Sequence, residues 1–290
     1  MSMKEIEIDE KVMERYDLTS ISRTLYSNYQ TFMQDINIWI NLKRILPKEI
    51  FEQIGYLEAT TVGHKIVNDF VMKFYPGEQM LKYALAKRYI QKENEVSAFE
   101  IRVNDSRLDV GRINGNSYAY EIKTEFDSLD KLRKQIEDYS TVFEYVYVLV
   151  HEIHLEKTLQ LAPDHCGIIS YKEEKGEVKL SFRKKVNRSE KLSKESMLNN
   201  LNLKELTKIL KELGYNQAAK EPREIKENLL LDFNDQKINA LFKRALKERY
   251  NNQWRNLQEN FEDIYPIDMQ AVFKSSASPK QIYYKNSFSV

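Results

Sequence analysis

The stretch Arg107-Leu-Asp-Val-Gly-Arg-Ile-Asn-Gly-Asn-Ser-Tyr-Ala-Tyr-Glu-Ile-Lys123 places Asp109 twelve residues ahead of the triplet Glu121-Ile122-Lys123, across an expected hairpin. Successive side chains of a strand point to opposite faces, so Glu121 and Lys123 share one face while Ile122 turns to the other. Two carboxylates and one ammonium group can therefore meet at this hairpin.

These residues have the composition of a site for a hard divalent cation. Mg²⁺ and Mn²⁺ prefer oxygen ligands, which Asp109, Glu121 and the main-chain carbonyl of Ile122 would supply. Lys123 beside the ion could orient an attacking water or stabilise charge that develops on a phosphate. The pattern predicts hydrolysis of phosphodiester bonds with Mg²⁺ or Mn²⁺ as cofactor.

The length of the hairpin loop tests this interpretation. In an antiparallel pair, a slip of one residue moves every side chain to the other face. Asp109 and Glu121 share a face only if the loop has an odd number of residues, for example three with a glycine bulge around Asn114-Gly115. We predict an odd loop, because a two-residue Asn-Gly turn would direct Asp109 away.

The segment after the hairpin predicts a helix and then a buried strand. Asp127 or Ser128 would cap the helix, and its apolar residues recur at three- and four-residue steps: Leu129, Leu132, Ile136, Tyr139 and Phe143. Residues 145–150 form a continuous run of β-branched, aromatic and aliphatic residues, which predicts a central strand buried on both faces.

The segment ahead of the hairpin predicts another helix, which Pro76-Gly77 opens and which runs to about Gln91. Its apolar face carries Glu78, and this placement is costly unless something binds the carboxylate. Glu78 is therefore a candidate metal ligand, although a glutamate in a first turn also complements the helix dipole without any other role. Glu100, on the next expected strand, is a weaker candidate.

Several of these residues match the motif of a known superfamily. In the PD-(D/E)XK nucleases, a first acidic residue is followed, after a hairpin, by Glu-X-Lys on the next strand. Asp109, Glu121 and Lys123 occupy these positions, and Leu108 stands where the motif has its proline. The chain resembles this superfamily, and residues 107 to about 150 are similar to a bacterial branch of it.

The helix after the hairpin adds to the resemblance, because exonuclease-like branches carry Gln-X-X-X-Tyr there and Gln135 and Tyr139 match it. The resemblance implies that Asp109, Glu121 and Lys123 are catalytic and that Gln135 and Tyr139 position the nucleic-acid backbone or the site. Two simpler readings stay open. Tyr139 can pack in the core, and Gln135 can face solvent.

The formal net charge of +1 hides an uneven distribution. Residues 171–250 contain 20 Lys and Arg against 13 Asp and Glu, a surplus of seven, and the rest of the chain carries 25 against 31. The densest basic cluster is Arg183-Lys-Lys185 with Arg188. Basic surface supplies most of the sequence-independent affinity for nucleic acid, so we expect nucleic acid, above all DNA, as partner. A solvated loop explains the cluster equally well.

We expect an α/β fold with a restriction-endonuclease-like core, in which helices flank a mixed central sheet, and helical extensions at both ends. The sections are an N-terminal helical extension (1–72, with breaks at Pro47 and Gly55), the core (73–190, ending in a hairpin around Lys175-Gly176), a helical section (191–252) and a tail (253–290). The third section, with Lys220 and Arg223 ahead of its second helix, resembles a SAP-like module, which implies DNA contact; simple packing of these helices is the alternative. The tail leaves a homo-oligomer or a protein partner open.

Other features narrow the function. The single cysteine, Cys166, cannot form an internal bridge and is expected to be a structural thiol. His151 and His154 lack the spacing of a helical zinc motif, and there is no phosphate-binding Gly-rich loop. No apolar run approaches a membrane span and no secretory signal is present, which predicts a cytoplasmic protein. The alternatives are a non-cleaving nucleic-acid-binding or assembly protein and an RNA-directed nuclease.

Overall fold

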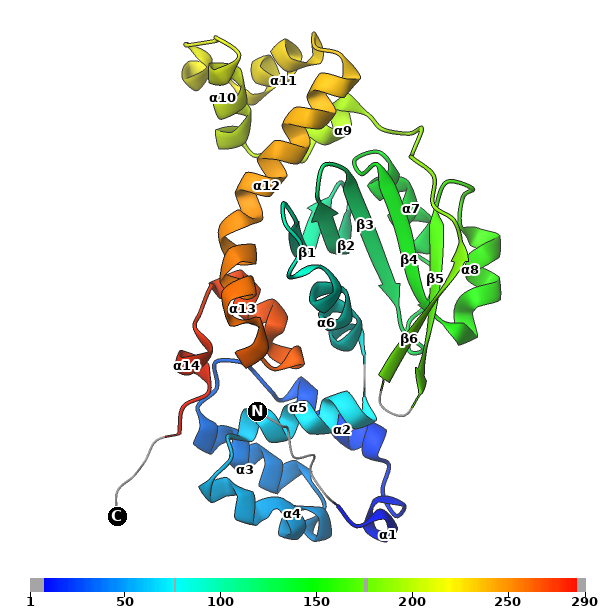
Figure 1. Ribbon diagram of the computed structural model, residues 1–290, viewed down its shortest axis with the longest axis vertical. Helices are drawn as coiled ribbons and strands as arrows, with labels where there is room; N and C mark the ends of the chain where they lie inside the picture. Colours follow the sequence, from blue (N-terminus) through cyan, green and yellow to red (C-terminus); the bar gives the residue numbers. More distant parts are fainter. Residues whose placement is uncertain (1–7, 76, 175–176, 286–290) are drawn as a thin grey trace. The chain divides into compact units, whose positions relative to one another are not determined.

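The computed structural model describes residues 8–75, 77–174 and 177–285 (Figure 1). Contacts between Cα atoms divide the chain into two compact units. The first unit joins Met1–Leu85 to Arg255–Val290, and the second is Ala86–Trp254. Helices α6 (Glu78–Tyr89) and α12 (Asp235–Asn260) each contain one of the boundaries.

The first unit is helical. Its N-terminal helices are α1 (Glu10–Met13), α2 (Leu18–Ser27), α3 (Asp35–Ile45), α4 (Lys48–Ile54) and α5 (Gly63–Phe74), and its C-terminal helices are α13 (Met269–Ser275) and α14 (Pro279–Ile282). The predicted breaks at Pro47 and Gly55 are confirmed, since they flank α4. Buried Ile267 belongs to the same apolar cluster as Trp39 and Phe70, so the C-terminal segment completes the core of the N-terminal helices.

The second unit is built on a six-stranded sheet whose strands follow chain order across it. The strands are β1 (Val96–Val103), β2 (Ser106–Ile113), β3 (Ser117–Lys123), β4 (Tyr145–His151), β5 (Gly167–Glu174) and β6 (Glu177–Lys184). β3 with β4 and β4 with β5 pair parallel, and the other pairs are antiparallel. The parallel pairs are connected through α7 (Leu132–Ser140) and α8 (Leu155–Leu161). The predicted α/β fold with a mixed sheet and flanking helices is confirmed.

The β2–β3 hairpin has the odd loop that the sequence predicts. Ile113 pairs with Ser117, which leaves the three residues 114–116 in the turn. Gly115 has a φ of 108°, a conformation that side chains other than glycine rarely adopt. The ladder ends at Val110 paired with Tyr120. If this register is extended by one residue, Asp109 lies opposite Glu121.

The predicted strand at 145–150 is confirmed as β4, fourth of six in the sheet. The prediction of burial on both faces holds for its second half, because Val148, Leu149 and Val150 are fully buried. It is wrong for Tyr145 and Tyr147, which remain half-buried. Their rings lie on a face of the sheet that is partly open.

The predicted cap of α7 is wrong. The carboxylate of Asp127 instead accepts bonds from the amide (2.7 Å) and the hydroxyl (2.6 Å) of Thr124. Ser128 accepts from the amide of Asp130, and the helix begins only at Leu132. Asp127 closes the turn after β3 and Ser128 bonds to Asp130, so neither side chain caps the helix N-terminus. Leu129, expected in the helix, lies ahead of it and is still buried.

The section after the sheet contains α9 (Lys194–Asn199), α10 (Leu203–Glu212), α11 (Arg223–Leu231) and α12. The helices expected near 203–214, 222–231 and 238–250 are present, and the last is longer than expected, with 26 residues. The expected hairpin at the end of the core is formed by β5 and β6, whereas Lys175-Gly176 lies outside the described residues. In the described part of the chain, no helix has the length and apolar character needed to cross a bilayer.

A buried carboxylate, Glu144, joins the sheet to the following helices. Its oxygens accept bonds from the amide of Ser117 (2.8 Å), Asn239 (2.8 Å), Lys243 (3.0 Å) and Arg188 (3.1 Å). Burial alone would raise the pKa of Glu144, but the bonds from Lys243, Asn239 and Ser117 outweigh it and lower the pKa below its usual value. The carboxylate form is thus favoured by the fold.

We expect Glu144→Gln to reduce stability at pH 7 and to lose this effect in acid. A carboxyl whose pKa is lowered by folding stabilises the fold above its unfolded pKa of about 4.5, and the gain disappears as the pH falls through the folded value. At pH 7, Glu144→Ala should cost about 3 kcal/mol, because Lys243 then loses a buried partner. Urea unfolding from pH 7 to pH 3 measures both effects. Exposed Glu137→Gln is the matched control, and an equal response from it would contradict the prediction.

Candidate active site

The carboxylate of Glu121 is held by three donors in the second unit. Its Oε1 accepts from Lys123 Nζ (2.8 Å) and from Gln135 Nε2, and its Oε2 lies 2.8 Å from the hydroxyl of Tyr139. The side chain of Glu121 is only 2% exposed. Strand alternation places Glu121 and Lys123 together, and the one-turn spacing on α7 brings Gln135 and Tyr139 to the same carboxylate. The structure therefore joins four of the predicted site residues.

Tyr139 is a hydrogen-bond donor to this carboxylate. Burial raises its pKa most, and the charges of Glu121 and Asp109 raise it further, so the phenol keeps its proton. The hydroxyl also lies 2.9 Å from the carbonyl oxygen of Arg107 on β2. Tyr139 thus packs in the core and also contacts the site, which combines the two readings that the sequence left open.

Asp109 lies beside the segment of β3 that carries Glu121 and Lys123. Its Oδ2 accepts from the amide of Ile122 at 2.6 Å, one position beyond the last ladder pair of β2 and β3. The side chain has replaced a main-chain acceptor at this point. Asp109 is thereby fixed next to the Glu-Ile-Lys triplet, as the hairpin argument predicts.

Glu100, the weaker metal-ligand candidate from the sequence, lies beside Asp109. One of its carboxylate oxygens lies within 4.8 Å of an Asp109 oxygen. The flanking pairs, Phe99 with Val110 and Ile101 with Leu108, set it opposite Asp109. Its φ of 57° is unusual for a residue with a side chain, and such strain is concentrated at functional sites. The strand pattern of the sequence gave no sign of this conformation.

The pair Glu100–Asp109 is suited to a hard cation, since two carboxylates less than 5 Å apart repel each other unless a positive charge lies near. Arg107 supplies part of this charge through an ion pair with Glu100 at 2.5 Å. Asp109 is only partly buried, so its site is accessible to an ion. The donor set therefore fits Mg²⁺ or Mn²⁺.

Glu78 stands in the first turn of α6, in the first unit. It pairs with Lys82 one turn later, and buried Lys82 also donates to Gln270 at 3.0 Å. The ion pair accounts for a carboxylate on the apolar side of this helix. A metal-ligand role for Glu78, like that of the carbonyl of Ile122, stays a prediction.

The remaining sequence features behave as ordinary structural groups. Burial raises the pKa of the Cys166 thiol to about 12, in line with the expected structural role. His151, at the end of β4, accepts from the amide of Ile153 (3.4 Å). In the basic cluster, Arg183 pairs with Glu152, and Arg188 pairs with Glu144. Much of this positive charge is therefore used within the fold.

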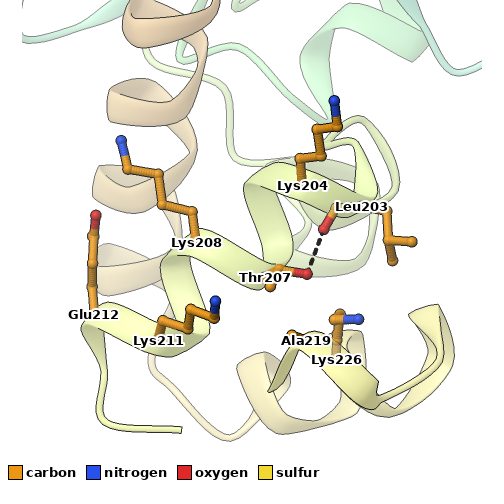
Figure 2. A pocket seen from close by; sticks show the side chains of 8 residues that line it. All are labelled: Leu203, Lys204, Thr207, Lys208, Lys211, Glu212, Ala219 and Lys226. Atoms are coloured by element: carbon orange, nitrogen blue, oxygen red, sulfur yellow. Dashed lines mark hydrogen bonds between the residues drawn. The ribbon is translucent and has the colours of Figure 1, made fainter. Parts of the chain in front are cut away.

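A second basic surface was missed by the sequence analysis. A hollow of about 460 Å³ lies against α10, and Figure 2 shows its lining side chains. Lys204, Lys208 and Lys211 project from α10 at helical spacing, while Lys226 of α11 is buried beneath the hollow and donates to the carbonyl oxygen of Glu221. The spacing of these lysines could have revealed the surface. Arg223, part of the SAP-like pattern, donates to the carbonyl oxygens of Leu201 and Leu198.

Residues 75–272 match the family model described as Bacteriophage P4 protein cII. The chain belongs to this phage P4 cII family. Protein cII of Enterobacteria phage P4 is 25% identical over 144 residues, which cover 50% of this chain and 54% of that protein. The chain thus spans about half the length of the curated relative that it matches. No solved structure matches the chain. The cII match includes the whole sheet, the site around Glu121 and the hollow along α10.

We expect the buried ion pair between Lys123 and Glu121 to be important for the stability of the fold. Lys123→Met should lower the unfolding free energy by about 3 kcal/mol or more, because a charged carboxylate then remains buried without its cation. Replacing both partners, with Glu121→Leu added, should recover part of the loss, since no uncompensated charge remains. Urea unfolding of Lys123→Met, Glu121→Leu and the double variant gives a double-mutant cycle that measures the interaction between the two residues. The prediction is contradicted if the double variant loses as much unfolding free energy as the two single variants lose together.

Proposed function

We propose that the protein hydrolyses phosphodiester bonds of DNA with Mg²⁺ or Mn²⁺. The observation that carries the proposal is the arrangement of Asp109 against the Glu121-Ile122-Lys123 triplet, with Glu100 beside it. These groups combine oxygen donors for a metal ion with an ammonium group. Phosphodiester hydrolysis needs both, because the attacking water must be activated and charge on the phosphate must be stabilised.

Each residue has a role that follows from its contacts. Asp109 and Glu100 would hold the ion, with Glu121 on the neighbouring strand. When bound, the ion supplies a Lewis acid for the phosphate oxygen and a more acidic water. Lys123 Nζ, now on Glu121, can turn its remaining protons to a phosphate oxygen or to the water. Gln135 and Tyr139 are positioning residues, because they fix the Glu121 carboxylate that holds Lys123.

Cleavage should depend on Asp109. Asp109→Asn removes a ligand charge, yet its amide oxygen can still accept from the amide of Ile122, so the fold should persist. We expect roughly a hundredfold or greater loss of metal-dependent cleavage. The assay uses single- and double-stranded DNA and RNA with Mg²⁺, with Mn²⁺ and with a chelator.

Asp105→Asn is the matched control, since this exposed aspartate lies four residues earlier in the chain. It should cleave at the normal rate. Cleavage by Asp109→Asn that equals that of the unaltered protein would remove the basis of the proposal. A preference for RNA in the same assay would retain the chemistry and identify an RNA-directed nuclease.

One observation favours a second function, a nucleic-acid-binding or assembly protein that does not cleave. Glu121 is saturated by three donors and nearly inaccessible, which is the state of a structural ion pair. Calorimetry with Mn²⁺ distinguishes the two functions. Heat of binding that disappears in Asp109→Asn supports the metal site, whereas no heat and no cleavage of any substrate support the second function.

The lysine-lined hollow along α10 gives the proposed partner a binding surface. Lys204 and Lys211 stand exposed there, and Lys208 pairs with Glu248. Each phosphate contact on duplex DNA contributes about 0.9 to the slope of log affinity against log salt. The surface therefore makes a quantitative prediction that does not involve cleavage.

The double variant Lys204→Ala/Lys211→Ala should weaken binding to duplex DNA and reduce that slope by about 1.8. Fluorescence anisotropy at several salt concentrations, in the presence of a chelator, gives the slope. Exposed Lys237→Ala, on α12, is the control and should change the slope less. An unchanged slope in the double variant would show that duplex DNA binds elsewhere.

A further inference from the structure

A second hollow, within the second unit, is lined by one residue of β4 and by the end of β6 with the two residues that follow it. It encloses about 370 Å³ and is lined by Tyr147, Phe182, Arg183, Lys184, Lys185 and Val186. Two of these residues are aromatic, three are cationic and none is acidic. Phe182 is 64% exposed, which is unusual for so large an apolar side chain on a strand. Neither the proposed cleavage site nor the lysines of α10 belong to this hollow.

The aromatic side of the hollow continues across the sheet as stacked rings. The rings of Tyr147 and Tyr120 are 5.1 Å apart and inclined by 8°, and those of Tyr145 and Tyr118 are 5.2 Å apart and inclined by 21°. The parallel register of β3 and β4 sets each pair side by side. These tyrosines therefore form a row of stacked rings in which Tyr120 is buried and Tyr147 lies at the hollow.

Gly167 allows this row of rings to form. It is paired with Tyr147 in the sheet, and a Cβ at this position would lie 2.6 Å from the tyrosine ring and 2.9 Å from Val186. Any larger residue would push the ring of Tyr147 from its place. The absence of a side chain at Gly167 thus keeps the ring against the sheet and the hollow open.

The cations at the hollow are fixed in different ways. Arg183 donates to Ser170 (2.8 Å) and Glu152 (2.7 Å), and Lys184 donates to the carbonyl oxygen of Pro163 (2.9 Å). Lys185 is exposed beside them. Arg183 and Lys184 are therefore held by partners within the fold, with Glu152 and Asp164 as their acidic neighbours, while Lys185 can reach a ligand directly.

We propose that this hollow binds single-stranded nucleic acid. An unpaired base can stack on Phe182 next to the ring of Tyr147, and the phosphate that follows can pair with Lys185. Aromatic platforms beside cationic residues bind single strands in this way with little dependence on sequence. Duplex DNA fits the surface poorly, because its bases already stack on each other and present only their edges. An acidic peptide would use the cations but leave the exposed ring of Phe182 in water.

This inference rests on the proposed function only in taking nucleic acid as the partner. The inference concerns binding in the absence of metal, so the binding test and the cleavage test have independent outcomes. The protein can cleave nucleic acid without binding it at the hollow, and it can bind nucleic acid at the hollow without cleaving it. The two sites are also separate in the sheet. Tyr120 and Glu121 are neighbours on β3 and point to opposite faces.

The test is fluorescence anisotropy of a labelled oligothymidine with the full chain and a chelator. Phe182→Ala should weaken binding about tenfold, and Phe182→Trp should retain it, because an indole also stacks on bases. Lys185→Ala should reduce the salt slope by about 0.7, the value for one phosphate on a single strand. A duplex of the same length should respond less than twofold to the Phe182 variants.

The tryptophan variant gives a direct readout as well. The two natural tryptophans, Trp39 and Trp254, are buried, so the introduced exposed indole should dominate the quenching that base stacking produces. Ile225→Ala removes an exposed apolar side chain from α11 and is the control. Unchanged affinity in Phe182→Ala, unquenched emission in Phe182→Trp, or equal losses on single strand and duplex would each overturn the proposal.

Discussion

The buried carboxylate of Glu121 is the constraint around which the second unit is arranged. An ionised carboxylate with 1% exposure is stable only if every strong acceptor position is filled. The donors come from two places, Lys123 on the same strand and the pair Gln135 and Tyr139 on α7. Since both α7 residues must reach one carboxylate, the helix can dock on the sheet in only one position and rotation. The charge thus fixes the packing of the helix.

A second constraint acts where the ladder between β2 and β3 ends. Beyond Val110 and Tyr120, the side chain of Asp109 accepts the Ile122 amide that a main-chain carbonyl would otherwise accept. On the neighbouring strand, Glu100, opposite Asp109, has a positive φ. Both departures cost stability, and together they set two carboxylates within 4.8 Å. A purely structural sheet has no need of either feature, and this is the physical argument for a site here.

The sequence predicted those parts of the fold that depend on local periodicity. Strand alternation and the parity of the loop were sufficient for the hairpin, and the one-turn spacing of Gln135 and Tyr139 anticipated their common target. The start of α7 was predicted wrongly, because Asp127 is used by Thr124 in a turn that competes for the same side chain. Glu144 was not recognised at all. Its partners are up to 99 residues away in sequence, and no local pattern records such contacts.

The excess of positive charge in residues 171–250 does not by itself say which side chains are available to a ligand. Arg183, Arg188 and Arg223 are directed to carboxylates or main-chain carbonyls of their own unit, so much of their charge is spent on the fold. Arginine suits such tasks because its fork makes several fixed hydrogen bonds. Exposed charge remains on lysines, which are strongly hydrated point charges and which line both hollows. The position of each basic residue therefore matters more than the total charge of the segment. The two hollows also differ in their aromatic residues. The hollow beside β6 includes the exposed ring of Phe182, which suits it to bases, whereas the hollow along α10 is lined by lysines without aromatic residues, which suits it to phosphates.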